Sequence, residues 1–239
     1  MAGSLKSPPV SHSAPIHLRP TAPLAERLLL PGDPGRALAL AQALLLEPRM
    51  FNHNRGLWGY TGQTAGGEAL TIQATGMGGP SAAIVLWELI ALGARSAIRV
   101  GTCGALAPGL ELGDLIVARE AICADGTSRA LGAGDRTAAD PALTVALIRE
   151  APTARAGTVV SVDLFHDSAL PRDADQALAV EMESAALFAV GAAGGVPVAS
   201  VLVVSDTFDS DGSRTRIEDQ PLLEAAERMG AAAIAALGA

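Results

Sequence analysis

The sequence is poor in cysteine and in aromatic residues. Its 2 cysteines, Cys103 and Cys123, are too few for a disulfide framework and fit a reducing compartment. Aromatic residues make up 3% of the 239 residues, so the core has to be built from Ala, Leu and Val. No apolar run reaches the roughly 18 residues that a membrane span requires. We therefore expect a cytoplasmic globular protein without a membrane partner.

Positive charge and cofactor motifs are also scarce. The formal net charge of -8 argues against binding nucleic acid or an anionic membrane. No Cys/His cluster has metal-ligand spacing, and no Gly-x-Ser-x-Gly elbow occurs. The glycines of ATGMGGPS have neither P-loop nor dinucleotide-fingerprint spacing. We expect no metal and no cofactor. The Ser/Pro-rich residues 1–15 are expected to form a flexible tail before a single domain over residues 16–239.

Short apolar runs alternate with Ala/Leu-rich helical patterns along the chain. The predicted strands are Leu28–Leu30, Leu70–Ala74, Ala97–Val100, Leu115–Ile122, Thr158–Leu164 and Val198–Val204. The predicted helices are Gly35–Leu46, Ser81–Leu92, Pro141–Glu150, Glu183–Ala193 and Pro221–Leu237. Several strands are continuously apolar, as strands covered on both faces are. This alternation predicts an α/β fold with a mostly parallel sheet flanked by helices.

Arginine and glycine gather where the predicted strands end, which is where open α/β sheets bind ligands. LPGDPGR carries Gly32 and Arg36 at the start of a helix, where an anion is favoured. RVGTCG, interpreted as a turn, carries Arg99 and Thr102, and HNRG offers Arg55. A guanidinium binds phosphate oxygens in pairs and stays charged. These motifs indicate a phosphate site, although an arginine paired with a buried carboxylate, or one facing solvent, is the simpler alternative.

Three carboxylates lie at the ends of predicted elements, two of them before a predicted helix and one at the end of a predicted strand. VEMESAALF places Glu181 and Glu183 before an apolar helix, where they could accept hydrogen bonds from sugar hydroxyls or simply face the helix dipole. VVSD ends a strand with Asp206, which could be a general acid if burial favours its protonated form, or could cap a turn. His17, taken alone, is more typical of a surface residue.

Taken together and in order, the motifs resemble the nucleoside phosphorylase family, which includes hexameric purine nucleoside phosphorylase and uridine phosphorylase. The matching stretches run from residue 16 to 206: HLRP, LLLPGDPGRA, NHNRGLWGYTG, GMGGPSAAIVLWEL, IRVGTCGAL, VDLF, VEMESAALF and VVSD. The resemblance implies a distorted, barrel-like mixed sheet. It also implies that inorganic phosphate, as co-substrate, attacks C1′ of a purine nucleoside and releases the free base in nucleoside salvage.

The resemblance also implies a role for each matching residue. The implied phosphate contacts are Gly32, Arg36, Arg99, Thr102 and, from a neighbouring subunit, Arg55. The implied ribose contacts are His17, which reaches across from the neighbour, Met77, Met182 and Glu183. The implied base contacts are Cys103, Gly104, Phe165, Val180, Glu181 and Ser205. Asp206 matches the acid that protonates purine N7, with Arg214 or Arg216 assisting it. Shared sites imply a homo-oligomer, a hexamer built as a trimer of dimers.

Three other functions remain open from the sequence. Uridine phosphorylase is the nearest alternative, but its Gln-x-Arg pair is missing and the strand-end Asp206 favours purines. A 5′-methylthioadenosine phosphorylase shares nearly all of the motifs. A nucleoside-binding protein without turnover is a different class, and it is disfavoured because the whole set of site residues is retained. The chain departs from the family pattern at His166, where tyrosine is usual, and at Thr207, where histidine often follows the acid.

Overall fold

The computed structural model describes residues 15–166, 170–209 and 211–238, so all but the last residue of the expected tail lies outside the described residues. The described strands are β1 (Arg27–Leu30), β2 (Leu46–Asn52), β3 (Gly59–Gln63), β4 (Ala69–Gln73), β5 (Ser96–Ala105), β6 (Leu115–Ala124), β7 (Arg136–Ala138), β8 (Arg155–Val162), β9 (Ala179–Glu181), β10 (Val198–Phe208) and β11 (Arg214–Arg216). The described α-helices are α1 (Pro34–Leu44), α2 (Gly79–Ala91), α3 (Gly126–Ala130), α4 (Pro141–Glu150), α5 (Ser184–Gly194) and α6 (Asp219–Leu237).

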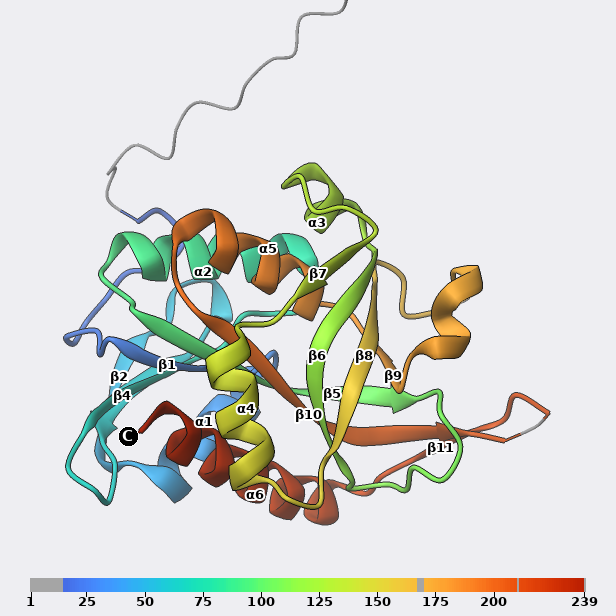
Figure 1. Ribbon diagram of the computed structural model, residues 1–239. Coiled ribbons are helices and arrows are strands. Elements are labelled where there is room, and N and C mark those ends of the chain that lie inside the picture. The colour runs from blue at the N-terminus through green and yellow to red at the C-terminus, as the bar shows by residue number, and fades with distance from the viewer. Residues whose placement is uncertain (1–14, 167–169, 210, 239) are drawn as a thin grey trace, which may run out of the picture.

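The strands form one mixed sheet that closes on itself at one end. Their order is β11-β10-β6-β8-β9-β5-β1-β4-β3-β2, with β7 on β6, and β10 also pairs with β5. That additional pairing joins β10, β6, β8, β9 and β5 into a ring, while β1 to β4 continue the sheet outward (Figure 1). The long ladders β1–β5, β5–β10 and β6–β8 are parallel. The predicted mixed, barrel-like α/β fold is confirmed.

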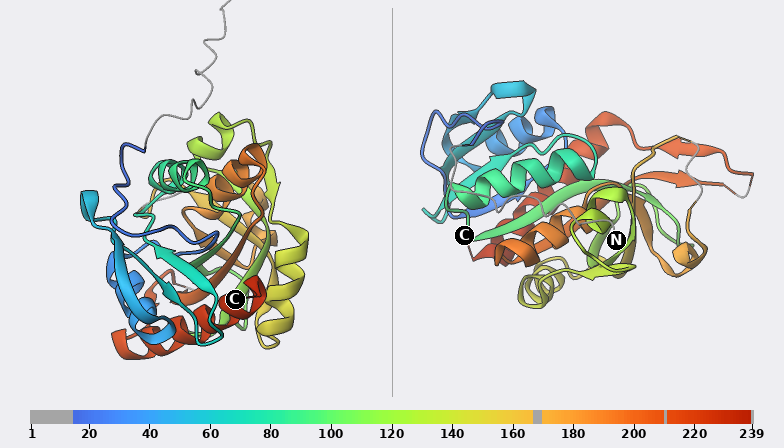
Figure 2. Two further views of the ribbon diagram at one scale, coloured as in Figure 1. Left: turned by 90° about the vertical axis from the view of Figure 1, so that its left-hand side faces the viewer. Right: turned by 90° about the horizontal axis from the view of Figure 1, so that it is seen from above.

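Helices cover both faces of the sheet. In Figure 1, α2 and α5 lie side by side above it, and α1, α4 and α6 lie below; Figure 2 shows the same layers from two other sides. Alternate residues of β1 serve the two cores: Leu28 and Leu30 pack in the cluster with α2 and α5, whereas Leu29 packs in the cluster with α1 and α6. A strand buried on both faces needs apolar residues at every position, which explains the continuous apolar runs.

The predicted helices are all present, with ends that differ by a few residues. The short α3 and the strands β2, β3, β7, β9 and β11 were not predicted, because they lack long apolar runs. One prediction was wrong in kind: the stretch GTCG, expected to be a turn after residue 100, continues β5 to Ala105. Likewise β10 continues through VVSD to Phe208, so Asp206 caps no turn.

Candidate active site

Arg99 is almost fully buried in the middle of β5. Its side chain is 3% exposed; Nε lies 3.0 Å from Oε2 of Glu181 and Nη2 lies 2.6 Å from Oε2 of Glu183. A Cβ on Gly101 would lie only 2.6 Å from Cζ and from Nη2 of Arg99, so the missing side chain at position 101 makes room for the guanidinium. The glycine therefore permits a close approach within a strand, where we had expected a turn.

The two carboxylates bind only two of the three guanidinium nitrogens of Arg99. Burial alone lowers the pKa of Arg99, but the carboxylates of Glu183 and Glu181 raise it above its usual value, so the group stays charged. The third nitrogen, Nη1, is buried and has no hydrogen-bond partner among the described residues. Buried polar groups are rarely left unpaired in folded proteins. The expected alternative, an arginine paired with buried carboxylates, thus accounts for two of its three nitrogens.

Arg36 and Arg216 bring further positive charge towards Arg99. Burial lowers the pKa of Arg36; Asp33 opposes this, and the charges of Arg99 and Arg216 lower it further. Arg36 lies in the first turn of α1, whose N-cap Asp33 accepts hydrogen bonds from the N–H groups of Gly35 and Arg36. Like charges of this kind repel unless an anion lies between them. The first turn of α1 and the middle of β5 therefore form one basic cluster.

Two more of the predicted phosphate residues lie on the same elements. The carbonyl of Gly32 accepts a hydrogen bond from the N–H of Gly76 at 3.0 Å, which ties the loop before α1 to the loop before α2. Thr102 is half-buried on β5, three positions after Arg99. The structure thus brings Gly32, Arg36, Arg99 and Thr102 to neighbouring elements, because β1 pairs in parallel with β5.

Glu181 holds the start of α5 in place. Its carboxylate accepts hydrogen bonds from the N–H groups of Glu183 at 3.0 Å and Ser184 at 2.9 Å, from the hydroxyl of Ser161, and from Arg99. Four protein groups donate to Glu181, enough to fill the roughly four acceptor positions of a carboxylate, so its side chain anchors α5. The base contact expected for Glu181 stays a prediction. The helix-dipole alternative, raised for both glutamates, applies to Glu181.

Glu183 is the carboxylate that remains available. It pairs with Arg99 and accepts a hydrogen bond from the N–H of Gly78. Burial raises the pKa of Glu183; Arg99 opposes that shift and Glu181 adds to it. Because carboxylate oxygens accept several hydrogen bonds each, Glu183 can still accept from a ligand hydroxyl beside the basic cluster.

Asp206 lies on β10 and is 5% exposed. In the antiparallel β10–β11 pair, Arg216 lies opposite Asp206, and Arg214 projects from the same face two residues earlier. Arg214 approaches Oδ1 of Asp206 with Nη2 at 2.7 Å and Nε at 2.8 Å, whereas Nη1 of Arg216 is 3.4 Å away. Ser205 donates to Oδ2 at 2.6 Å. Of the two candidate arginines, Arg214 makes the closer contact.

An apolar wall lies beside Arg214. The Arg214 guanidinium stacks 4.5 Å from the ring centroid of Phe165, a ring that is 53% exposed. On the neighbouring strands, Gly104 pairs with Val180, and the Phe208 ring fills the space at Gly104. The expected base residues Cys103, Gly104, Val180 and Ser205 therefore meet where β5, β9 and β10 join. Burial raises the pKa of the Cys103 thiol, with Glu181 adding to the shift and Arg99 opposing it.

His17 and Arg55 have no contact with the basic cluster among the described residues. Nδ1 of His17 lies 2.7 Å from Oε1 of Glu88 on α2, and Arg55 is exposed in a left-handed turn with φ of 58°. Met77 is 87% exposed, whereas Met182 packs against the cluster around Val160. Met77 and Met182 directly precede Gly78 and Glu183, which are hydrogen-bonded to each other, whereas no hydrogen bond or ion pair joins His17 or Arg55 to Glu183 among the described residues.

Two supporting residues, Gly101 and Glu88, were not predicted from the sequence. Gly101 lies within RVGTCG, but its role depends on where the Arg99 side chain folds. Glu88 is the lone charge of the apolar run VLWELI, just as Arg99 is the lone charge of the apolar run AIRV. Buried charges are costly without partners, so a lone charge in an apolar run could have indicated Glu88.

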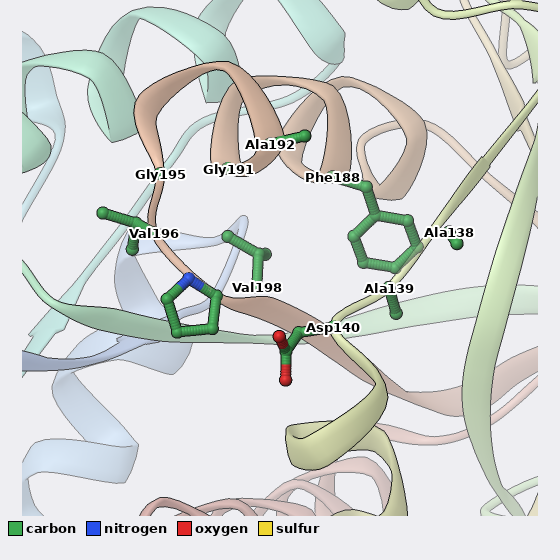
Figure 3. Close-up of a pocket in the computed structure, with 10 residues that line it drawn as sticks. Ala138, Ala139, Asp140, Phe188, Gly191, Ala192, Gly195, Val196 and Val198 are labelled. Atoms are coloured by element: carbon green, nitrogen blue, oxygen red, sulfur yellow. The ribbon is translucent and has the colours of Figure 1, made fainter.

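The site does not coincide with the hollow drawn in Figure 3. That hollow, about 310 Å³, lies at the start of β10, lined by Val198, Pro197, Phe188 and other small or apolar residues. Asp140 is the charged residue among them, and it already caps α4 by accepting from the N–H of Leu143 at 2.9 Å. Asp206 lies eight positions after Val198 on β10, about 26 Å along the strand. None of the residues that line this hollow has a side-chain donor for an anion.

Within the described part of the chain, no group of three or more His, Cys, Asp or Glu side chains is arranged to hold a metal ion. Among the described helices, none combines the length and apolarity needed to cross a membrane.

Comparison with known proteins identifies the family. Residues 26–238 match the sequence profile of the phosphorylase superfamily. The chain is 38% identical over 233 residues to the purine nucleoside phosphorylase DeoD-type of Geobacillus kaustophilus, covering 88% of this chain and 97% of that one. It is 37% identical to the enzyme of the same name from Oceanobacillus iheyensis, covering 82% and 88%. The crystal structure of uridine phosphorylase from Vibrio fischeri aligns with a TM-score of 0.76 at 26% identity, over 90% and 92%. The chain therefore belongs to the phosphorylase superfamily and is an enzyme, as its ordered motifs predicted.

Proposed function

We propose that the protein catalyses the phosphorolysis of purine ribonucleosides and 2′-deoxyribonucleosides, giving the free purine and ribose or deoxyribose 1-phosphate in nucleoside salvage. The observation that carries the proposal is the buried, unpaired Nη1 of Arg99, beside Arg36 and Glu183. The names of the Geobacillus and Oceanobacillus relatives support it. Inorganic phosphate is the co-substrate, and the reaction needs no further cofactor.

A phosphate in this cluster needs a cation beyond those of the cluster itself. The guanidinium groups of Arg36, Arg99 and Arg216 face the carboxylates of Glu181, Glu183 and Asp33, so these six charges balance before an anion binds. A phosphate dianion adds about two negative charges, and a further arginine would offset part of them. Arg55 of a neighbouring subunit is proposed to supply that charge. Phosphate held by Nη1 of Arg99, Arg36 and Thr102 would lie next to Glu183, which accepts hydrogen bonds from the sugar hydroxyls.

The reaction then follows from charge placement. As the C1′–N9 bond breaks, its electron pair passes to the purine and positive charge develops on the ribose. The phosphate beside Arg99 offsets the ribose charge, and one of its oxygens forms the new bond to C1′. Asp206 in its protonated form gives its proton to N7 of the leaving purine, which typically contributes about 10²–10⁴-fold. Arg214 holds the Asp206 carboxylate in place, and the base packs against Phe165 and Val180.

One simple assay tests the proposal. Purified protein is incubated with inosine, with and without phosphate, and free hypoxanthine is measured. Release that requires phosphate is the expected result. Release without phosphate would instead show hydrolysis, and tight inosine binding with no release in either condition would show a binding protein without turnover.

Pyrimidine nucleosides are the second candidate substrate, because the Vibrio fischeri neighbour of similar structure is a uridine phosphorylase. The buried Asp206 with its arginine partners favours purines, since a purine has the N7 that this acid can protonate. A panel of kcat/KM values for adenosine, inosine, guanosine, 5′-methylthioadenosine and uridine separates these alternatives. A uridine value above all four purine values would overturn the purine assignment.

We further propose that the active unit is a homo-oligomer, a hexamer made of three dimers, in the cytoplasm. His17 and Arg55 have no contact with their own basic cluster among the described residues, and this supports a site completed by a neighbour. Mass photometry of active protein should show hexamers. Full activity from a species that is only monomeric would contradict shared sites.

A further inference from the structure

The segment that carries His17 is fixed to α2 by a single carboxylate. Glu88 accepts hydrogen bonds from the N–H groups of Ile16 at 3.0 Å, His17 at 3.0 Å and Leu18 at 2.7 Å, and it also lies 2.7 Å from Nδ1 of His17. Burial by itself raises the pKa of Glu88, but these donors lower it below its usual value. An ionised carboxylate only accepts, so Nδ1 of His17 carries the hydrogen and donates it to Glu88, which leaves Nε2 as the second ring nitrogen for a ligand.

The turn that carries Arg55 is fixed by a second polar network, centred on the fully buried Asn52. Its Nδ2 donates to the carbonyl of Leu57 at 2.5 Å, and its Oδ1 accepts from the N–H of Asn54 at 3.3 Å. The 3-10 turn Asn54–Gly56 lies between these two anchors. Arg55 and Gly56 both have positive φ, of 58° and 69°. A non-glycine residue keeps such a conformation when its surroundings hold both ends of the turn.

The two networks are joined directly. Nδ2 of Asn54 donates to the carbonyl of His17 at 2.8 Å, and Oδ1 of Asn52 accepts from the N–H of Arg19 at 2.9 Å. Below these bonds, Leu18 and Phe51 are both fully buried in the same core cluster. The two segments are more than thirty positions apart in the sequence. Thr21 joins them further, because its N–H donates to the carbonyl of Phe51 and its hydroxyl donates to the carbonyl of Met50.

We propose that Asn52 and Asn54 are positioning residues that join the His17 segment and the Arg55 turn into one rigid unit. The sugar contact of His17 and the phosphate contact of Arg55 then depend on a single element, and loosening it weakens both. This inference rests on the proposed function for those two contacts. Glu88 orients the ring of His17 within the unit, so that the unit presents an acceptor for a sugar hydroxyl and a guanidinium for phosphate at a fixed separation.

The test compares Asn54→Leu with His53→Ala. Asn54→Leu removes the donor to His17 while keeping similar bulk, and His53 is an exposed residue of the same turn without a side-chain cap bond. In the full-length oligomer, Asn54→Leu should raise the KM for inosine and the KM for phosphate about tenfold each, with a smaller change in kcat. His53→Ala should leave both values within twofold. If His17→Ala and Arg55→Ala each raise a KM but Asn54→Leu raises only one KM or neither, the proposal is overturned.

Hydrogen–deuterium exchange separates this inference from the proposed function. In the ligand-free protein, Asn54→Leu should speed exchange in peptides covering residues 16–21 and 52–58 together, whereas exchange confined to one segment would refute the rigid unit. Should Asn54→Leu fail to fold, Asn54→Ser removes the same bond with a smaller side chain and is measured in the same way. His17→Ala should raise only the inosine KM and Arg55→Ala only the phosphate KM. If neither variant raises its KM, but Asn54→Leu still speeds exchange in both segments, then the rigid unit exists. In that case His17 does not contact the sugar and Arg55 does not contact phosphate.

Discussion

Replacing Gly101 with alanine tests whether the position of Arg99, and not merely its charge, supports the reaction. The φ of Gly101 lies outside the left-handed region, so an alanine fits the backbone there. Its Cβ, however, would lie 2.6 Å from Cζ and Nη2 of Arg99, whereas ordinary contacts begin at 3.4 Å. The guanidinium therefore has to move by about 1 Å, and a misplacement of that size can cost about 10²-fold in rate.

The expected loss falls on phosphate. The displaced Arg99 weakens its bonds to Glu181 and Glu183 and redirects Nη1, so kcat/KM for phosphate should fall by about 10²-fold at saturating inosine. Overpacking a core in this way also destabilises a protein by about 1–3 kcal/mol. The assay follows hypoxanthine release over a phosphate series, below the Tm of the variant, with thermal unfolding measured alongside.

Gly134→Ala is the matched control, because a Cβ at that position meets no atom within 4 Å and its φ is also ordinary. It should keep the wild-type kcat/KM and Tm. If Gly101→Ala folds and retains kcat/KM for phosphate within twofold of the wild type, then the guanidinium geometry described for Arg99 does not hold the phosphate. The unpaired Nη1 of Arg99 would then not be a phosphate donor.

Three further predictions concern the groups around the sugar and the base. Asp206→Asn should lower kcat for inosine by about 10²–10⁴-fold, while phosphate binding measured by calorimetry persists; near-wild-type turnover would show that the acid is another group. Arg214→Gln should lower kcat about tenfold more than Arg216→Gln, because Arg214 lies 0.7 Å closer to Asp206, at 2.7 against 3.4 Å; equal losses would contradict this ranking. Because burial raises the pKa of Glu183, the carboxylate is protonated at a higher pH than an ordinary glutamate. The KM for inosine should therefore rise as the pH falls from about 7 to about 5, and a flat profile would contradict a sugar contact by Glu183.

Local patterns in the sequence were enough to predict the main elements. The apolar run of β10 and the helical periodicity of α6 depend on neighbouring residues alone, and the structure confirms both elements. Short strands such as β9 and β11 carry no such pattern, because three residues cannot show a period and their stability comes from their partners.

The candidate site was predictable as a set of residues, but the part that each one plays was not. The two glutamates of VEMESAALF look equivalent in the sequence. In the structure, Glu181 accepts hydrogen bonds from the start of α5, from Ser161 and from Arg99, whereas Glu183 accepts from Gly78 and Arg99 and can accept a further hydrogen bond from a ligand. The two arginines after Asp206 were likewise equivalent. The β10–β11 register places Arg216 opposite Asp206, yet the side-chain distances place Arg214 closer to it. Each distinction depends on distances between side chains in the folded protein, and local sequence patterns do not determine those distances.

Neighbouring residues alone show which chemistry is present: a lone arginine in an apolar strand, a helix start with glycine and arginine, and a carboxylate after a buried strand. How these groups combine depends on contacts between distant parts of the chain. Arg99 and Glu181 are separated by 82 positions and meet because β9 pairs with β5 in the sheet. Periodicity and propensity act over a few residues, whereas strand order is set by the packing of the whole chain.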